Sequence, residues 1–172
     1  MQNTNWNQIV KKFGPLVWHT AFKLLDNKED AADCFQQTFL NALEYSKKNK
    51  IKHYPAFLTK AATSRAIDIL RQRKTQCFCD DAVNFVETNE RDPMAAIETK
   101  ELADKLRFAL SWLIPIEAEI FALRHFNNMS YGEIAKSVGI STSNVGVILL
   151  RAKSKIKKHL EAQGVQKKGV AI

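Results

Sequence analysis

The sequence predicts an all-α protein with two small helical domains joined by a flexible acidic linker. Glycine and proline are sparse, six and four in 172 residues, and apolar residues recur at intervals of three or four, which is typical of helices. Residues 77–98 hold a net charge of −5, so the rest of this chain of net charge +8 carries +13. Basic blocks at 47–74 and 151–168 flank the acidic segment, which indicates two anion-binding surfaces joined by a segment that avoids them.

The composition favours a polyanion as the partner. A pI of about 9.4 points towards nucleic acid. No apolar run approaches the roughly 18 residues that span a bilayer, and the N-terminus lacks a hydrophobic signal core. We therefore expect a cytoplasmic protein without membrane insertion. Three cysteines are too few, and odd in number, for a secreted disulfide framework.

The first domain is predicted over residues 5–75. Apolar residues from Trp6 to Leu25 predict a first helix pair or one bent helix, because Pro15 lies inside the pattern. Asn27 is placed to cap a second helix that runs to about residue 43. Tyr54 and a proline open a third helix, which ends in the basic stretch 71–74. Residues 76–97 follow as an extended linker, because they show no sustained periodicity.

The second domain is predicted over residues 98–162, with a frayed tail at 163–172. One helix runs from about Glu98 and stops before Pro115, and another follows to residue 126. Ser130 and Glu133 have the S-x-x-E spacing of a capping box, which starts a short helix. Gly139 suits the left-handed residue that ends this helix, and Ser141 is placed to cap the next.

This arrangement predicts a helix-turn-helix. Apolar residues repeat along one face of the last helix, and the opposite face carries Ser143, Asn144, Gly146, Val147, Leu150, Arg151 and Lys155. A capped basic helix after a tight turn has the geometry that enters the major groove of DNA. An ordinary helical hairpin is the alternative for this segment alone.

Several ordered motifs over residues 8–162 resemble the bacterial RNA polymerase sigma factors of the extracytoplasmic-function (ECF) type, in the sigma-70 family. EDAADCFQQTFLNAL (29–43) resembles the family's polymerase-docking helix, and TKAATSRAIDILRQRK (59–74) resembles the helix that reads the −10 element. In the second block the family pattern is matched by Leu123-Arg124, by SYGEIA from Ser130, and by GIS from Gly139. Ile114 before the proline departs from the usual leucine.

The resemblance implies a sigma-2-like first domain and a sigma-4-like second domain. It assigns the binding of core RNA polymerase to Asp33, Gln36 and Gln37. Gln37 replaces the Glu that is usual in the family. It assigns recognition of the −10 element of promoter DNA to Lys60, Ser64, Arg65, Asp68, Arg71, Arg73 and Lys74. A protein that binds single-stranded DNA needs cations to contact the phosphates and aromatic rings on which the bases stack. Tyr54 and Phe57 are the stacking candidates, although core packing is the preferred interpretation for Phe57.

The resemblance assigns recognition of the −35 element to the helix-turn-helix. The residues that it implies are Arg124, Ser141, Ser143, Asn144, Gly146, Val147, Leu150, Arg151 and Lys155. Gly146 and Val147 replace cations of the usual pattern, so the family's promoter consensus does not transfer. Arg124 and Arg151 become the main candidates for bidentate or phosphate contacts, and Val147 or Leu150 for a thymine methyl group.

The resemblance further implies a non-catalytic specificity subunit that binds core RNA polymerase and directs promoter-specific initiation. No cofactor, metal or small-molecule substrate is expected, and an anti-sigma factor is an expected partner. In this family the linker threads towards the active-site and RNA-exit channels of polymerase, and a segment of net charge −5 suits such a basic path. A merely flexible tether is the competing interpretation.

Two other classes of function stay open at this point. A LuxR-type transcription regulator shares the Glu-Ile-Ala and recognition-helix pattern, but it predicts a ligand or receiver domain upstream. A small metal-dependent enzyme would use Cys77 and Cys79 with His53 or His125. A C-x-C pair without a second pair is a weak metal signal, and the histidines are scattered, so we expect no metal site.

Overall fold

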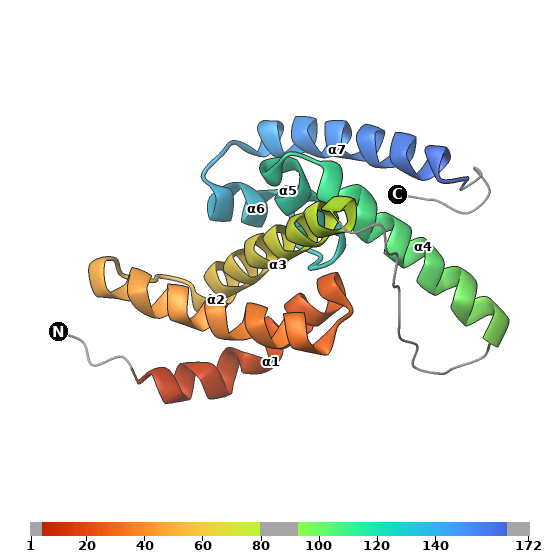
Figure 1. The fold of residues 1–172 in the computed structure, drawn as a ribbon. Coiled ribbons are helices and arrows are strands. Elements are labelled where there is room, and N and C mark those ends of the chain that lie inside the picture. The colour runs from red at the N-terminus through yellow and green to blue at the C-terminus, as the bar shows by residue number, and fades with distance from the viewer. Residues whose placement is uncertain (1–4, 80–92, 165–172) are drawn as a thin grey trace.

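A computed structural model describes residues 5–79 and 93–164 of the chain, and every regular element in these ranges is a helix. The all-α prediction is therefore confirmed. The elements are α1 (Trp6–Leu25), α2 (Lys28–Lys48), α3 (Tyr54–Cys79), α4 (Pro93–Trp112), α5 (Pro115–His125), α6 (Tyr131–Val138) and α7 (Thr142–Ala162). Figure 1 shows α3 in the middle, with α1 and α2 on one side and α5, α6 and α7 on the other.

Capping residues mark the two ends of α1 and the start of α2. The side chain of Asn5 accepts from the backbone N–H of Gln8, and Asn27 caps α2 by accepting from Asp30 at 2.9 Å. Pro15 lies inside α1, which is one continuous helix and not a pair. Asp26 ends α1 in the left-handed conformation, at φ 47°.

The second half reproduces the predicted helix-turn-helix. Ser130 and Glu133 form the reciprocal capping box at the start of α6. These hydrogen bonds stabilise the Glu133 carboxylate and lower its pKa. Gly139 ends α6 at φ 81°, and the Ser141 hydroxyl then accepts from the backbone N–H of Asn144 at 3.2 Å, which caps α7.

The helices extend further into the expected linker than we predicted. α3 continues to Cys79 and α4 begins at Pro93, so residues 76–79 and 93–97 are helical, and residues 80–92 lie outside the described part. Residues 75–79 contain neither glycine nor proline, so nothing in them breaks the helix. Proline is favoured in a first helical turn, and this signal at Pro93 marked the earlier start of α4.

Helix α3 presents opposite faces to the two halves of the chain. Leu58, Ala62, Ala66 and Ile69 are buried on the face towards α1 and α2, and the Cys34 thiol of α2 contacts the Ala62 carbonyl. On the other side α3 packs on α4, α5 and α6. Buried residues of both halves consequently belong to one apolar cluster, and a smaller cluster around Val17, Phe39 and Leu58 lies within the first half.

Gly132 inside α6 and Gly139, which ends it, test whether the turn depends on backbone conformation. A Cβ added at either Gly139 or Gly132 meets nothing within 4 Å, but only Gly139 has positive φ. We expect Gly139→Ala to lower the free energy of unfolding by about 1 kcal/mol, because a Cβ strains the left-handed conformation. Gly132→Ala should raise it by about 0.5 kcal/mol, since alanine is the better helix former. Urea unfolding of both variants measures the difference, and equal effects would contradict the assignment.

Candidate nucleic-acid interface

The outward face of α7 is open to solvent. Leu150 is 71% exposed and Val147 48% exposed, and Ser143, Asn144 and Arg151 are exposed beside them. The opposite face is buried through Val145, Leu149, Ala152, Ile156 and Leu160. The face that the sequence singled out is therefore the free face of a rigidly packed helix.

Gly146 brings the backbone of α7 close to a neighbouring aromatic ring. A Cβ at this position would lie 3.7 Å from Cε2 of Tyr131, which starts α6 and is 42% exposed. The guanidinium of Arg124 lies 5.5 Å from the centre of the same ring, and its Nη1 donates to the Met129 carbonyl at 3.0 Å. These contacts hold Arg124 against the helix-turn-helix.

Two other predicted −35 residues have structural partners. Lys155 donates to both carboxylate oxygens of the buried Glu117 at 2.8 Å, which ties α7 to α5. Ser141 serves as the cap of α7. Ser143, Asn144, Val147, Leu150 and Arg151 are left as the exposed group around Gly146 that can meet the edges of bases.

The predicted −10 residues on α3 are held by contacts within the chain. Arg71 donates from Nη1 to the Leu113 carbonyl at 3.0 Å, and the Lys74 ammonium lies 4.2 Å from the centre of the Trp112 ring. Arg73 pairs with Asp30 of α2 and donates to the last carbonyl of α1, that of Leu25, at 3.0 Å. Arg73 thus satisfies a free helix C-terminus.

The remaining −10 candidates differ in exposure. Asp68 is exposed, while Lys60, Ser64 and Arg65 are half-buried. The Nε of Arg65 is buried and has no hydrogen-bond partner in the described part of the chain. Lys60 and Asp68 both interact electrostatically with the carboxyl of Glu119 in α5.

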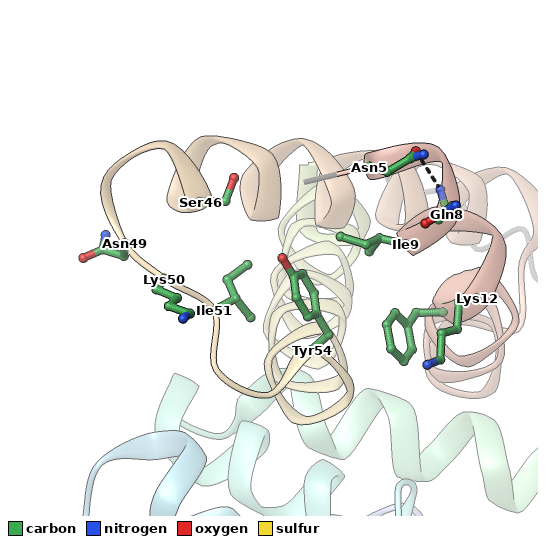
Figure 2. Close-up of a pocket in the computed structure, with 10 residues that line it drawn as sticks. Asn5, Gln8, Ile9, Lys12, Ser46, Asn49, Lys50, Ile51 and Tyr54 are labelled. Atoms are coloured by element: carbon green, nitrogen blue, oxygen red, sulfur yellow. Dashed lines mark hydrogen bonds between the residues drawn. The ribbon is translucent and has the colours of Figure 1, made fainter. Parts of the chain in front are cut away.

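An open hollow of about 670 Å³ lies where α1, the loop after α2 and the start of α3 meet (Figure 2). It is lined by Asn5, Gln8, Ile9, Lys12, Phe13, Ser46, Asn49, Lys50, Ile51 and Tyr54. Tyr54 is packed between Phe13, at a ring-centre distance of 6.0 Å, and Trp6, at 6.4 Å. Phe57 packs on Tyr45 at 4.9 Å and belongs with the apolar core of the first half.

The amide and lysine residues of this hollow were missed in the sequence, and only Tyr54 was singled out. A usable signal was present: an amide-rich N-terminal segment, NTNWNQ, and a basic loop, KKNKIK, both flank aromatic residues. Nothing in the periodicity shows that these distant segments meet. That meeting follows from the packing of α1 against α3.

The predicted docking residues form part of an outward stripe on α2. Asp33 and Gln36 are exposed, and Gln37 donates to the side chain of Asn41 at 2.7 Å. Leu40, one turn further along the stripe, is 55% exposed. A single exposed apolar residue is ordinary on a protein surface, so the assignment of this stripe to polymerase docking stays a prediction.

The described residues show no group of three or more metal-ligating side chains, and Cys77 and Cys79 lie where side chains are outside the description. Burial raises the pKa of the Cys34 thiol to about 11, so this cysteine stays protonated at neutral pH. The His125 ring packs at a tilt on the Phe121 ring, with ring centres 4.4 Å apart, and burial lowers the pKa of His125. No helix of the described chain is long and apolar enough to cross a membrane.

Comparisons with known proteins match two regions of the chain. Residues 9–76 match the model of sigma-70 region 2, and residues 103–156 match that of sigma-70 region 4. The chain is 22% identical over 159 residues to the ECF RNA polymerase sigma factor SigE of Mycolicibacterium smegmatis, covering 91% of this chain and 62% of that protein. It is 27% identical over 139 residues to the RNA polymerase sigma factor SigV of Bacillus subtilis, covering 78% of each.

Two solved structures share the fold. CnrH, in complex with the cytosolic domain of CnrY, superposes with a TM-score of 0.56 at 22% identity, over 91% of this chain and 88% of that one. The sigma factor RpoE, in complex with the anti-sigma factor NepR from Bartonella quintana, gives 0.53 at 17% identity, over 91% and 97%. The chain belongs to the sigma-70 family, in its ECF subfamily. It spans about 62% of the length of its mycobacterial relative.

A double-mutant cycle will measure what the Arg73–Asp30 pair contributes. The two side chains are 34% and 33% exposed, so we expect a coupling energy of about 1 kcal/mol between Arg73→Ala and Asp30→Ala in the free energy of unfolding. The pair Glu44–Lys47, 68% and 58% exposed, serves as the control and should give less than about 0.5 kcal/mol. Zero coupling would show that Asp30 does not hold Arg73 and that only the bond to the Leu25 carbonyl does.

Proposed function

We propose that this protein binds core RNA polymerase and directs promoter-specific initiation by recognising −10 and −35 elements. The observation that carries the proposal is the presence of both sigma-70 regions, in order, on one chain whose helix-turn-helix has an open outward face. The protein acts as a specificity subunit, and polymerase performs the chemistry. Its place of action is then the cytoplasm, where the promoter and polymerase are.

The −35 element is assigned to the N-terminal part of α7. Base edges in the major groove are read by the N-terminal residues of such a helix. Asn144 and Arg151 supply hydrogen-bonding groups, and the exposed Val147 and Leu150 suit the methyl group of thymine. Gly146 lacks a side chain that would hold the helix away from the groove. We infer a −35 element that contains thymines opposite this apolar pair.

The −10 element is assigned to α3 and to the hollow beside its first turn. Single strands are bound by cations that follow the phosphates and by pockets and planes that hold unstacked bases. Lys60, Arg71 and Lys74 lie along one side of α3. The hollow combines amides with the Tyr54 ring and has lysines in its lining, so it suits one unstacked base.

The α2 stripe of Asp33, Gln36, Gln37 and Leu40 is assigned to polymerase docking. An anti-sigma factor is the proposed regulatory partner, and the solved relatives CnrH and RpoE, each in complex with a second protein, motivate that proposal. The rival LuxR-type regulator requires none of the α2 surface, so binding to core polymerase discriminates between the two functions.

We expect the double substitution Asp33→Ala/Gln36→Ala to weaken binding to core polymerase by about tenfold, because it removes two polar contacts worth roughly 0.5–1.5 kcal/mol each. Lys28→Ala, an exposed change on another side of α2, is the matched control and should leave affinity unchanged. Fluorescence anisotropy of labelled protein titrated with core enzyme gives both values. Equal affinities for the double variant and the wild type would remove the docking assignment.

Arg151→Ala tests the −35 assignment. If Arg151 reads a guanine, the substitution should cost about 1–3 kcal/mol at one −35 position and relax the preference there. Lys158→Ala removes the same charge from the C-terminal part of α7 and should weaken all promoters about equally. Selection from a promoter library with holoenzyme separates the two effects. An unchanged −35 profile together with unchanged affinity for Arg151→Ala would exclude this residue from the interface.

A further inference from the structure

We propose that Tyr131 is a further specificity-determining residue of the helix-turn-helix. Its ring, the bare backbone at Gly146 and the side chain of Leu150 together bind the C5-methyl group of one thymine. We call these three residues the Gly146 site. This inference rests on the proposed function of α7 and adds a residue of α6 to it. Helix α6, which begins at Tyr131, lies beside the first turns of α7 (Figure 1).

Gly146 leaves an opening on α7 that neither the backbone nor the packing requires. It lies inside the helix and has no positive φ, so its conformation is open to any residue. Among the described residues, an added Cβ would meet one side chain within 4 Å, the Tyr131 ring, with Cε2 at 3.7 Å. That distance is an ordinary contact, which alanine would make without strain. Glycine is a poor helix former, so the opening itself is the distinctive feature of this position.

Large apolar side chains around the opening are exposed. Tyr131 is 42% exposed and Leu150 71% exposed. Leu150 follows Gly146 by four residues, so it is the next side chain along the same face of α7. Val147, 48% exposed, lies further round the helix. One exposed apolar residue is ordinary, but three around one glycine form an apolar surface at the part of the helix that meets base edges.

The Tyr131 ring is held in place by residues outside α7. Ser130 and Glu133 form the capping box that fixes the first turn of α6. The guanidinium of Arg124 in α5 lies 5.5 Å from the ring centre, and its Nη1 donates to the Met129 carbonyl at 3.0 Å. A ring that is ordered before binding loses little freedom on contact, which suits a residue that discriminates between bases.

Thymine presents the apolar group that matches this surface. In the major groove its C5-methyl group marks it among the four bases. The Gly146 site offers a ring, an aliphatic side chain and a backbone without a Cβ, so a methyl group that approaches Gly146 is covered from two sides. A side chain at position 146 would hold the base further from the helix. The site therefore reads one thymine, and Tyr131 contributes through its ring.

Replacing thymine by deoxyuridine removes this methyl group and keeps the base pair. Once selection from a promoter library has given the −35 element, each of its thymines, on either strand, is replaced in turn. Competition against the unmodified promoter gives the affinity of holoenzyme for each probe. We expect wild-type holoenzyme to lose affinity about fourfold at one position, because one methyl-sized group is no longer buried.

Gly146→Ala should bring this ratio close to one at the same position, because the new Cβ fills the opening without a clash. Gly132→Ala makes the same change in α6, where a Cβ meets nothing within 4 Å of the described chain, and should keep the fourfold ratio. Tyr131→Phe should also keep it, and Tyr131→Ala should lose it. Each ratio compares two promoters with one variant, so a general loss of affinity cancels.

An element without a methyl-sensitive thymine would overturn the Gly146 site, and so would a fourfold ratio that persists in Gly146→Ala. Loss of the ratio in Val147→Ala but not in Gly146→Ala would assign the methyl contact to Val147 and overturn the site. If Tyr131→Phe weakens binding to the thymine and deoxyuridine promoters equally and the ratio is one throughout, the hydroxyl contacts a phosphate and the proposal is wrong. A holoenzyme that selects no −35 sequence refutes the proposed function itself, so the two failures are distinguishable.

Discussion

The structure depends on the burial of α3 between the two halves of the chain. Leu58, Ala62, Ala66 and Ile69 pack towards α1 and α2, while Ile67 belongs to the side that meets α4 and α5. A helix that is apolar on two sides is stable only when both sides are covered. The first half supplies one cover permanently. The second half supplies the other.

The ends of α1 show how tightly the halves are coupled. Free carbonyls at a helix C-terminus need donors. Arg73 of α3 satisfies the Leu25 carbonyl, and Arg107 of α4 satisfies that of Leu24. One of these arginines comes from each half. Separation of the halves would leave the contact with Arg73 in place and return the Leu24 carbonyl to water, so the first half keeps its own helix C-terminus anchored.

Much of the fold was predictable from local chemistry. Caps at Asn27, Ser130 and Ser141 and the glycine at position 139 marked helix ends that the structure reproduces, because these signals act over a few residues. The α7 face was also predictable, since periodicity separates its buried and exposed sides. The sequence did not predict the hydrogen-bond partners of Arg71 and Arg73, nor the hollow at Tyr54. These depend on contacts between residues far apart in the chain, which a charge pattern does not encode.

We propose different tasks for the open face of α7 and for the side of α3 that carries Lys60, Arg71 and Lys74. Gly146 and Val147 carry no charge, so we expect them to add nothing to the salt-dependent part of α7 binding to duplex DNA. A helix that relies on Val147 and Leu150 gains affinity mainly from close apolar contact. Such contact is short-ranged and adds little to steering. We therefore expect a free chain with this recognition helix to bind promoters weakly. In that case docking on polymerase through the exposed residues of α2 would precede promoter recognition.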